Sequence, residues 1–266
     1  MCPRGARLLT GTGGLLSAAT LVCHCLLIEG ADGLVLVDTG FGIDDARNPA
    51  QLGAPFRGLV RPRALREETA LEQIRALGHD PADVRHIVTT HLDLDHAGGL
   101  PDFPAAEVHL LGRELEAAMN PTLRERPRYV AAHWAHGPRW VTHEPEGEGW
   151  FGFESVRALP SSDEEILLIP LVGHTRGHTG VAVRSGDGWL LHCGDAYFNP
   201  GEVERPHSCP PGLTLFESMT EIDRTMRRSN RDRLAELAAS HASEVELICS
   251  HDAPTLARMR DAPADA

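Results

Sequence analysis

A short polar segment that follows an apolar run constrains this chain more than any other feature. Residues 90–99 read Thr-His-Leu-Asp-Leu-Asp-His-Ala-Gly-Gly, directly after a predicted strand from Val84 to Thr90. Four of these side chains are able to bind a metal ion: His91, Asp93, Asp95 and His96. Carboxylates and imidazoles packed this closely are costly to bury unless a cation lies between them. The segment therefore predicts a metal site at the end of a strand, rather than a solvated turn.

Three later segments place polar residues at strand ends in the same way. Gly173 to Thr179 contains His174 and His178, His192 to Asp195 ends a predicted hairpin, and Ser250 to Asp252 contains His251. Each segment alone is typical of an ordinary turn. Together, and in this order, they indicate one shared site.

Apolar periodicity predicts strands with helices between and after them. The first two strands form a hairpin, in which an apolar stretch from Leu15 to Ile28 and a run from Leu34 to Val37 flank a Gly-Ala-Asp-Gly turn. The later predicted strands are Val84–Thr90, Val108–Leu111, Ile166–Val172, Val181–Arg184, Trp189–Cys193 and Val245–Cys249. The predicted helices are Glu67–Leu77, Arg113–Met119 and Thr220–Ala239, the last with Met226, Leu234 and Leu237 inward. This pattern predicts sheets covered by helices, of the α/β or α+β class.

Charge and length limit the classes of partner. The formal net charge of −13 disfavours a protein that reads a nucleic-acid backbone or binds an anionic membrane, and favours a small-molecule substrate. No apolar run approaches the roughly 20 residues of a membrane span. Six scattered cysteines predict reduced thiols and a cytoplasmic location, and Cys23-His24-Cys25 is interpreted as core packing. We expect one domain over 1–266; the oligomeric state stays open.

From Val35 to His251 the motifs resemble those of the metallo-β-lactamase superfamily. The resemblance implies an α/β fold, a four-layer αββα sandwich with two divalent metal ions between the sheet edges. It implies a first metal held by His91, Asp93 and His174, a second held by Asp95, His96 and His251, and Asp195 as the bridging ligand. It also implies supporting, non-ligating roles for Asp38 and His178.

One position departs from the common pattern of this family, which is His-x-His-x-Asp-His. Asp93 stands where that pattern has its second histidine. A carboxylate is a harder donor than imidazole and adds negative charge to the first site. We expect zinc as the metal, with manganese and iron as alternatives.

The resemblance implies a hydrolase that cleaves a small ester, lactone or thioester with a metal-bridging hydroxide. Asp95 is a candidate to pass a proton to the leaving group, and Tyr197 is a candidate for polarising the substrate. A packed aromatic is the alternative for Tyr197. Other functions left open are a phosphodiesterase, a mononuclear iron oxygenase of the persulfide dioxygenase kind, and a non-catalytic metal-binding protein.

The segment from about 120 to 150 differs from its surroundings because it is rich in aromatic residues and histidines. Trp134, Trp140 and Trp150 lie in it, together with His133, His136 and His143. We expect a lid over the metals that sets substrate choice, with a core helix as the alternative. None of these histidines is expected to be a metal ligand.

Overall fold

The computed structural model describes residues 1–145, 149–159 and 165–261, and the described strands form two five-stranded sheets. The first sheet has the order β1-β2-β3-β4-β5, with β1 (Leu26–Gly30), β2 (Gly33–Val37), β3 (Val84–Val88), β4 (Glu107–Leu111) and β5 (Arg139–His143). The second has the order β10-β9-β8-β7-β6, with β6 (Val156–Arg157), β7 (Ile166–Pro170), β8 (Thr179–Ser185), β9 (Gly188–His192) and β10 (Val245–Ile248).

Strand direction explains why polar segments meet at one edge. The predicted hairpin is confirmed as antiparallel β1 and β2, although its first strand begins only at Leu26, near the end of the apolar stretch from Leu15. The pairs β2–β3, β3–β4 and β4–β5 are parallel. In the second sheet β9 and β10 are parallel. The carboxyl ends of parallel strands lie at the same edge of a sheet, which is where open α/β sheets place their binding sites.

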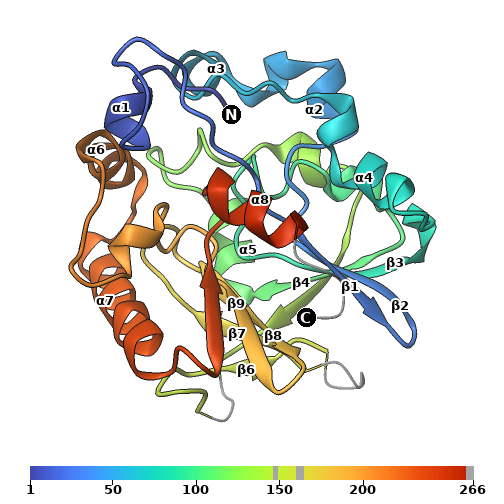
Figure 1. Ribbon diagram of the computed structural model, residues 1–266. Helices are drawn as coiled ribbons and strands as arrows, with labels where there is room; N and C mark the ends of the chain where they lie inside the picture. The colour runs from blue at the N-terminus through green and yellow to red at the C-terminus, as the bar shows by residue number, and fades with distance from the viewer. Residues whose placement is uncertain (146–148, 160–164, 262–266) are drawn as a thin grey trace.

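Helices pack against both sheets and at one end of the sandwich. They are α1 (Ala6–Leu9), α2 (Ile43–Arg47), α3 (Ala54–Leu59), α4 (Ala70–Ala76), α5 (Gly112–Met119), α6 (Pro211–Thr220), α7 (Arg224–Ser240) and α8 (Ala253–Asp261). Figure 1 shows α4 on one side of the strands and α7 on the other, with α1, α3 and α6 gathered at one end. Among the described residues, no helix combines the length and the apolar character needed to cross a bilayer.

Three apolar clusters hold the layers together. One lies between the sheets and includes Val37 and Val88 from the first sheet with Leu168 and Val181 from the second. The other two join each sheet to its helices, through Ala117 of α5 on one side and through residues of α7 on the other. The predicted four-layer αββα sandwich is confirmed.

The predicted long helix from Thr220 to Ala239 is wrong at its start. The helix is interrupted between α6 and α7, where the backbone N–H groups of Ile222 and Asp223 donate to the carbonyl of Gly173 at 2.8 and 2.9 Å. The Asp223 side chain then accepts from Met226 N and begins α7. Met226 is 43% exposed rather than inward, while Leu234 and Leu237 are buried as predicted. The break ties α7 to the loop that carries His174.

Candidate metal centre

The predicted ligands all follow strands that end at the same edge of the sandwich. His91 comes after β3, His174 after β7, Asp195 after β9 and His251 after β10. All four side chains are buried. The structure therefore brings together the four segments that the sequence singled out.

Asp195 lies between two groups of imidazoles. In the first group, its Oδ2 is 3.9 Å from His91 Nε2 and 3.4 Å from His174 Nε2. In the second, its Oδ1 is 3.4 Å from His96 Nε2 and 3.1 Å from His251 Nε2. Asp95 belongs to the second group, with Oδ2 3.8 Å from His251 Nε2. One carboxylate that faces two sets of ring nitrogens is the arrangement expected of a ligand shared by two cations.

Buried polar atoms without partners show where cations fit. His91 Nε2, His96 Nε2 and Asp195 Oδ1 are fully buried and have no hydrogen-bond partner among the described residues. Such orphaned atoms cost free energy unless something binds them. Burial would raise the pKa of Asp195, but His251 and His96 hold that pKa well below its usual range. Burial, and then Arg128, lower the pKa of His174 to about 4, which keeps this imidazole neutral and able to ligate.

Neighbouring residues orient these ligands as expected. Asp38 Oδ2 lies 2.8 Å from His96 Nδ1 and also accepts from Thr90 Oγ1 at 2.7 Å. Asp38 itself has a φ of 54°, a strained left-handed conformation for a residue with a side chain. His178 Nε2 accepts from the Asp195 N–H at 2.9 Å. A Cβ at position 194 would lie 2.5 Å from His178 Nε2, so only glycine fits before Asp195.

Glu114 of α5 joins the two loops that carry His91 and His174, and the sequence did not single it out. Its Oε1 accepts from Leu92 N at 3.0 Å and from Tyr129 Oη at 3.1 Å. Its Oε2 accepts from Thr175 Oγ1 at 2.7 Å and from Gly177 N at 3.0 Å. The available signal was a charged residue on the helix face that also carries the buried Ala117 and Ala118.

Arg128 pairs with the unusual Asp93, and sequence reasoning missed this partner too. Its Nε lies 2.9 Å from Asp93 Oδ1, and its Nη1 donates to the His174 carbonyl at 2.8 Å. The other carboxylate oxygen, Asp93 Oδ2, is 3.5 Å from His91 Nε2 and 3.1 Å from His174 Nε2. Asp93 is thus placed to contribute one oxygen to the first group while the guanidinium balances its charge.

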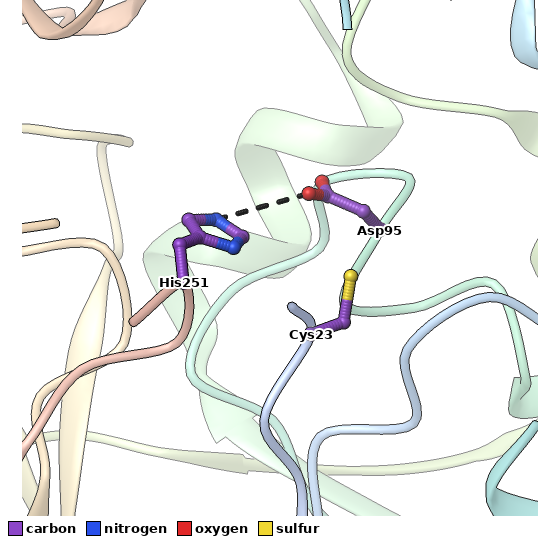
Figure 2. A group of neighbouring side chains, drawn as sticks. All are labelled: Cys23, Asp95 and His251. Atoms are coloured by element: carbon purple, nitrogen blue, oxygen red, sulfur yellow. Dashed lines mark ion pairs between the residues drawn. The ribbon is translucent and has the colours of Figure 1, made fainter. Parts of the chain in front are cut away.

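The interpretation of Cys23 as core packing needs correction. Cys23 precedes β1, and its Sγ lies within 4.8 Å of ligand atoms of Asp95 and His251. Figure 2 shows the three side chains pointing toward one another. Cys25, two residues further on, packs against the core of the first sheet as predicted.

Tyr197 does not take part in this constellation. Its side chain is 1% exposed and packs in the apolar cluster between the second sheet and α7. This is the alternative that the sequence had left open, so the structure gives no support to a substrate-polarising role.

In the described part of the aromatic segment, residues 120–145 and 149–150, the residues that line the cavity near the centre come from its beginning. Trp134 and Trp140 pack against the core of the first sheet, and His133 pairs with Asp45 at 2.9 Å. Arg124, Pro127 and Arg128 instead line the cavity described next. A lid over the metals therefore remains a prediction, and the tryptophans are not the residues to carry it.

An apolar cavity of about 590 Å³ opens above the ligand groups. Its charged and imidazole lining consists of Asp93, Asp95, His174, Asp195 and His251 together with Arg4, Arg124 and Arg128. Its walls are mainly apolar side chains of the N-terminal segment, the α3 region and α6, among them Leu9, Leu21, Leu52, Phe56, Leu59, Leu213, Phe216 and Met219. The described cavity thus joins an apolar chamber to a charged floor.

A family model and curated relatives show which proteins this chain resembles in sequence. A model described as the metallo-beta-lactamase superfamily matches residues 19–238. A probable metallo-hydrolase of Mycobacterium tuberculosis is 46% identical over 242 residues, which cover 91% of this chain and 78% of the relative. An N-acyl homoserine lactonase of Rhizobium johnstonii is 29% identical over 175 residues, which cover 64% of each chain.

Solved structures resemble the whole chain. An N-acyl homoserine lactone hydrolase, with the product N-hexanoyl-L-homoserine bound at its catalytic metal center, has a TM-score of 0.71. The two share 20% sequence identity, and the likeness covers 97% of this chain and 92% of that one. At this identity the comparison shows a shared fold.

Proposed function

This chain belongs to the metallo-beta-lactamase superfamily, and from that premise we propose that it is a metal-dependent hydrolase of lactones or small esters that carry an apolar chain. The observation that carries the proposal is the position of the apolar cavity directly above the buried carboxylates and imidazoles. The lactonase names of relatives and structural neighbours support the lactone as the reacting group.

We assign His91, Asp93 and His174 to a first metal, Asp95, His96 and His251 to a second, and Asp195 to both. Two divalent cations bound there would lower the pKa of a shared water toward neutrality and polarise the substrate carbonyl. Zinc is the proposed metal, with manganese and iron as alternatives, because the donor set combines imidazoles with carboxylates.

The protein's own residues orient this chemistry and exclude water from it. Asp38 holds the ring of His96, and His178 holds the backbone at Asp195, so both ligands are set before substrate arrives. Asp95 lines the cavity floor and is therefore placed to carry a proton to the departing oxygen of the opened ring or ester. The apolar walls separate the reacting carbonyl from bulk water.

The cavity also predicts how rate depends on substrate length. Burying a methylene group is worth about 0.8 kcal/mol, so each one added should raise kcat/KM about fourfold until the chamber is filled. Phe56, Leu59 and Phe216 would contact the chain. A short acyl group would leave this apolar surface in contact with water.

The test begins with metal analysis of protein purified without added metal. The same sample is then assayed on N-acyl homoserine lactones of increasing acyl length, an acyl thioester, an aryl ester and a phosphodiester. We expect about two transition-metal ions per chain and a rate that rises with the acyl chain. Asp195→Ala should abolish turnover, whereas Asp187→Ala, in the exposed turn between β8 and β9, should not.

Two results would contradict the proposal. Protein that holds only traces of metal, and gains none on reconstitution, would exclude a metal-dependent hydrolase. If the phosphodiester were the substrate that is turned over and the lactones and esters were not, the phosphodiesterase alternative would replace this proposal.

A further inference from the structure

A thiol lies beside the second group of ligands, in a segment that the family ligand set does not include. Cys23 Sγ, a carboxylate oxygen of Asp95 and a ring nitrogen of His251 are all within 4.8 Å of one another. A divalent metal holds a sulfur ligand at about 2.3 Å and nitrogen or oxygen ligands at about 2.0–2.2 Å, so its ligand atoms lie at most about 4.5 Å apart, which is close to this limit. The three side chains come from three separate segments and point toward one another (Figure 2).

The backbone holds Cys23 at this position. His24 N donates to the Ser250 carbonyl at 2.9 Å, and Leu21 and Asp252 form an antiparallel bridge. His251 Nδ1 in turn donates to the carbonyl of Val22 at 2.7 Å, which leaves Nε2 facing the centre. The segment that carries Cys23 is therefore paired with the segment that carries His251, so the thiol has a defined place.

The neighbours of Cys23 are residues that we assign to the second metal. Asp95 and His251 each offer one ligand atom in the same group as the thiol. A divalent cation bound there would hold Cys23 as the thiolate, because a coordinating thiol is deprotonated outright. His251 also belongs to a neighbouring group with His96 and Asp195. In that group His96 Nε2 is buried and makes no hydrogen bond to any described residue, which is a second indication that a cation fits beside His251.

We propose that Cys23 is an additional thiolate ligand of the second metal, next to Asp95, His96, His251 and the shared Asp195. The inference rests on the proposed function, because it requires metal at the second group. It also makes the two sites chemically different: the first has the hard carboxylate of Asp93, and the second has a soft sulfur. The second site should then hold zinc or cobalt in preference to manganese.

Cobalt substitution gives a direct readout that does not depend on activity. Apo-protein is reconstituted with Co²⁺, and absorption is recorded for the wild type, Cys23→Ser and Cys25→Ser. Cys25 is the matched control, since it lies on the same segment and its Sγ donates to the Cys23 carbonyl at 3.7 Å. Ligation by Cys23 predicts a thiolate-to-cobalt charge-transfer band in the near ultraviolet for the wild type and Cys25→Ser, and its loss in Cys23→Ser.

A second readout uses the wild type alone and so stands even if Cys23→Ser does not fold. Apo- and metal-loaded protein are alkylated with iodoacetamide, and the modified peptide is identified by mass spectrometry. Bound metal should protect Cys23, and removal of the metal by a chelator should restore its alkylation. In addition, Cys23→Ser should lose its second metal to a competing chelator at least about tenfold more readily than Cys25→Ser.

The outcomes separate this inference from the proposed function. Visible cobalt bands without a charge-transfer band would show a metal centre that lacks the thiolate, which would overturn the role of Cys23 and leave the hydrolase proposal intact. A charge-transfer band that persists in Cys23→Ser would also overturn it. No cobalt binding at all would overturn both proposals.

Discussion

Replacing Glu114 by glutamine tests whether one buried carboxylate holds the two metal-binding loops together. Each carboxylate oxygen of Glu114 accepts two hydrogen bonds, one from a backbone N–H and one from a hydroxyl. The donors are Leu92 N and Tyr129 Oη at Oε1, and Gly177 N and Thr175 Oγ1 at Oε2. An amide keeps the shape of the side chain but has one oxygen and one NH₂ group. Whichever way it turns, the NH₂ group faces a hydroxyl and a backbone N–H.

The magnitude follows from these four contacts. The hydroxyl can rotate and accept from the amide, but the backbone N–H cannot, and an orphaned buried donor costs about 1–3 kcal/mol. The two contacts to the remaining oxygen lose their charge assistance, which is worth about 0.5–1 kcal/mol each. Part of this loss is offset because the neutral amide is cheaper to bury. We expect Glu114→Gln to lower the free energy of unfolding by about 2–4 kcal/mol.

Urea unfolding of the metal-free protein measures this change, and a zinc titration measures its effect on the site. Metal affinity should fall by about 10–100-fold, as is typical when a residue that orients ligands is lost. Glu116→Gln, at an exposed position of the same helix, is the control and should change stability by less than about 0.5 kcal/mol. Equal stability and equal zinc affinity for the two variants would refute the reasoning.

Three further predictions test other parts of the structure. Asp93→Ala should weaken binding of the first metal by at least about 10–100-fold. It should also lower the free energy of unfolding by about 3–5 kcal/mol, because Arg128 then keeps a buried charge without its carboxylate partner. Adding Arg128→Leu to this variant should recover part of that stability in urea unfolding. Trp140→Ala should lower Tm without changing the order of kcat/KM across substrates of different acyl length, because Trp140 packs against the core. Phe216→Ala should reduce the differences in kcat/KM between these substrates, because Phe216 lines the cavity. The reverse pattern would favour the aromatic segment as the lid. Burial and the neighbouring Glu202 raise the pKa of Glu217 to about 8, so the contribution of its protonated form to stability is complete below its ordinary pKa of 4.5 and is lost as the pH rises through 8. Glu217→Gln should remove that decline in Tm from a pH series of thermal unfolding. An unchanged decline would exclude Glu217 as its source.

Local sequence was enough to predict eight of the ten described strands and the order of the metal-binding segments, but it missed β5 (Arg139–His143) and β6 (Val156–Arg157). Alternating apolar residues and a Gly-Ala-Asp-Gly turn specify the β1–β2 hairpin, and continuous apolar runs specify the parallel strands. His91, Asp93, Asp95 and His96 follow β3 within six residues, so their proximity is a property of the chain itself. These features depend on neighbours in sequence, which is why they can be read without coordinates.

Tertiary structure alone decided which other side chains join them. Cys23 reaches the site because Val22 pairs with His251, 229 residues away, and Glu114 does so because α5 packs under two separate loops. Arg128 meets Asp93 in the same way, whereas Tyr197, which is near Asp195 in sequence, turns into the core. Even the break between α6 and α7 depends on a distant carbonyl, that of Gly173. Local periodicity cannot encode such contacts, because each is formed only when the layers pack and buried polar groups must find partners wherever the fold supplies them.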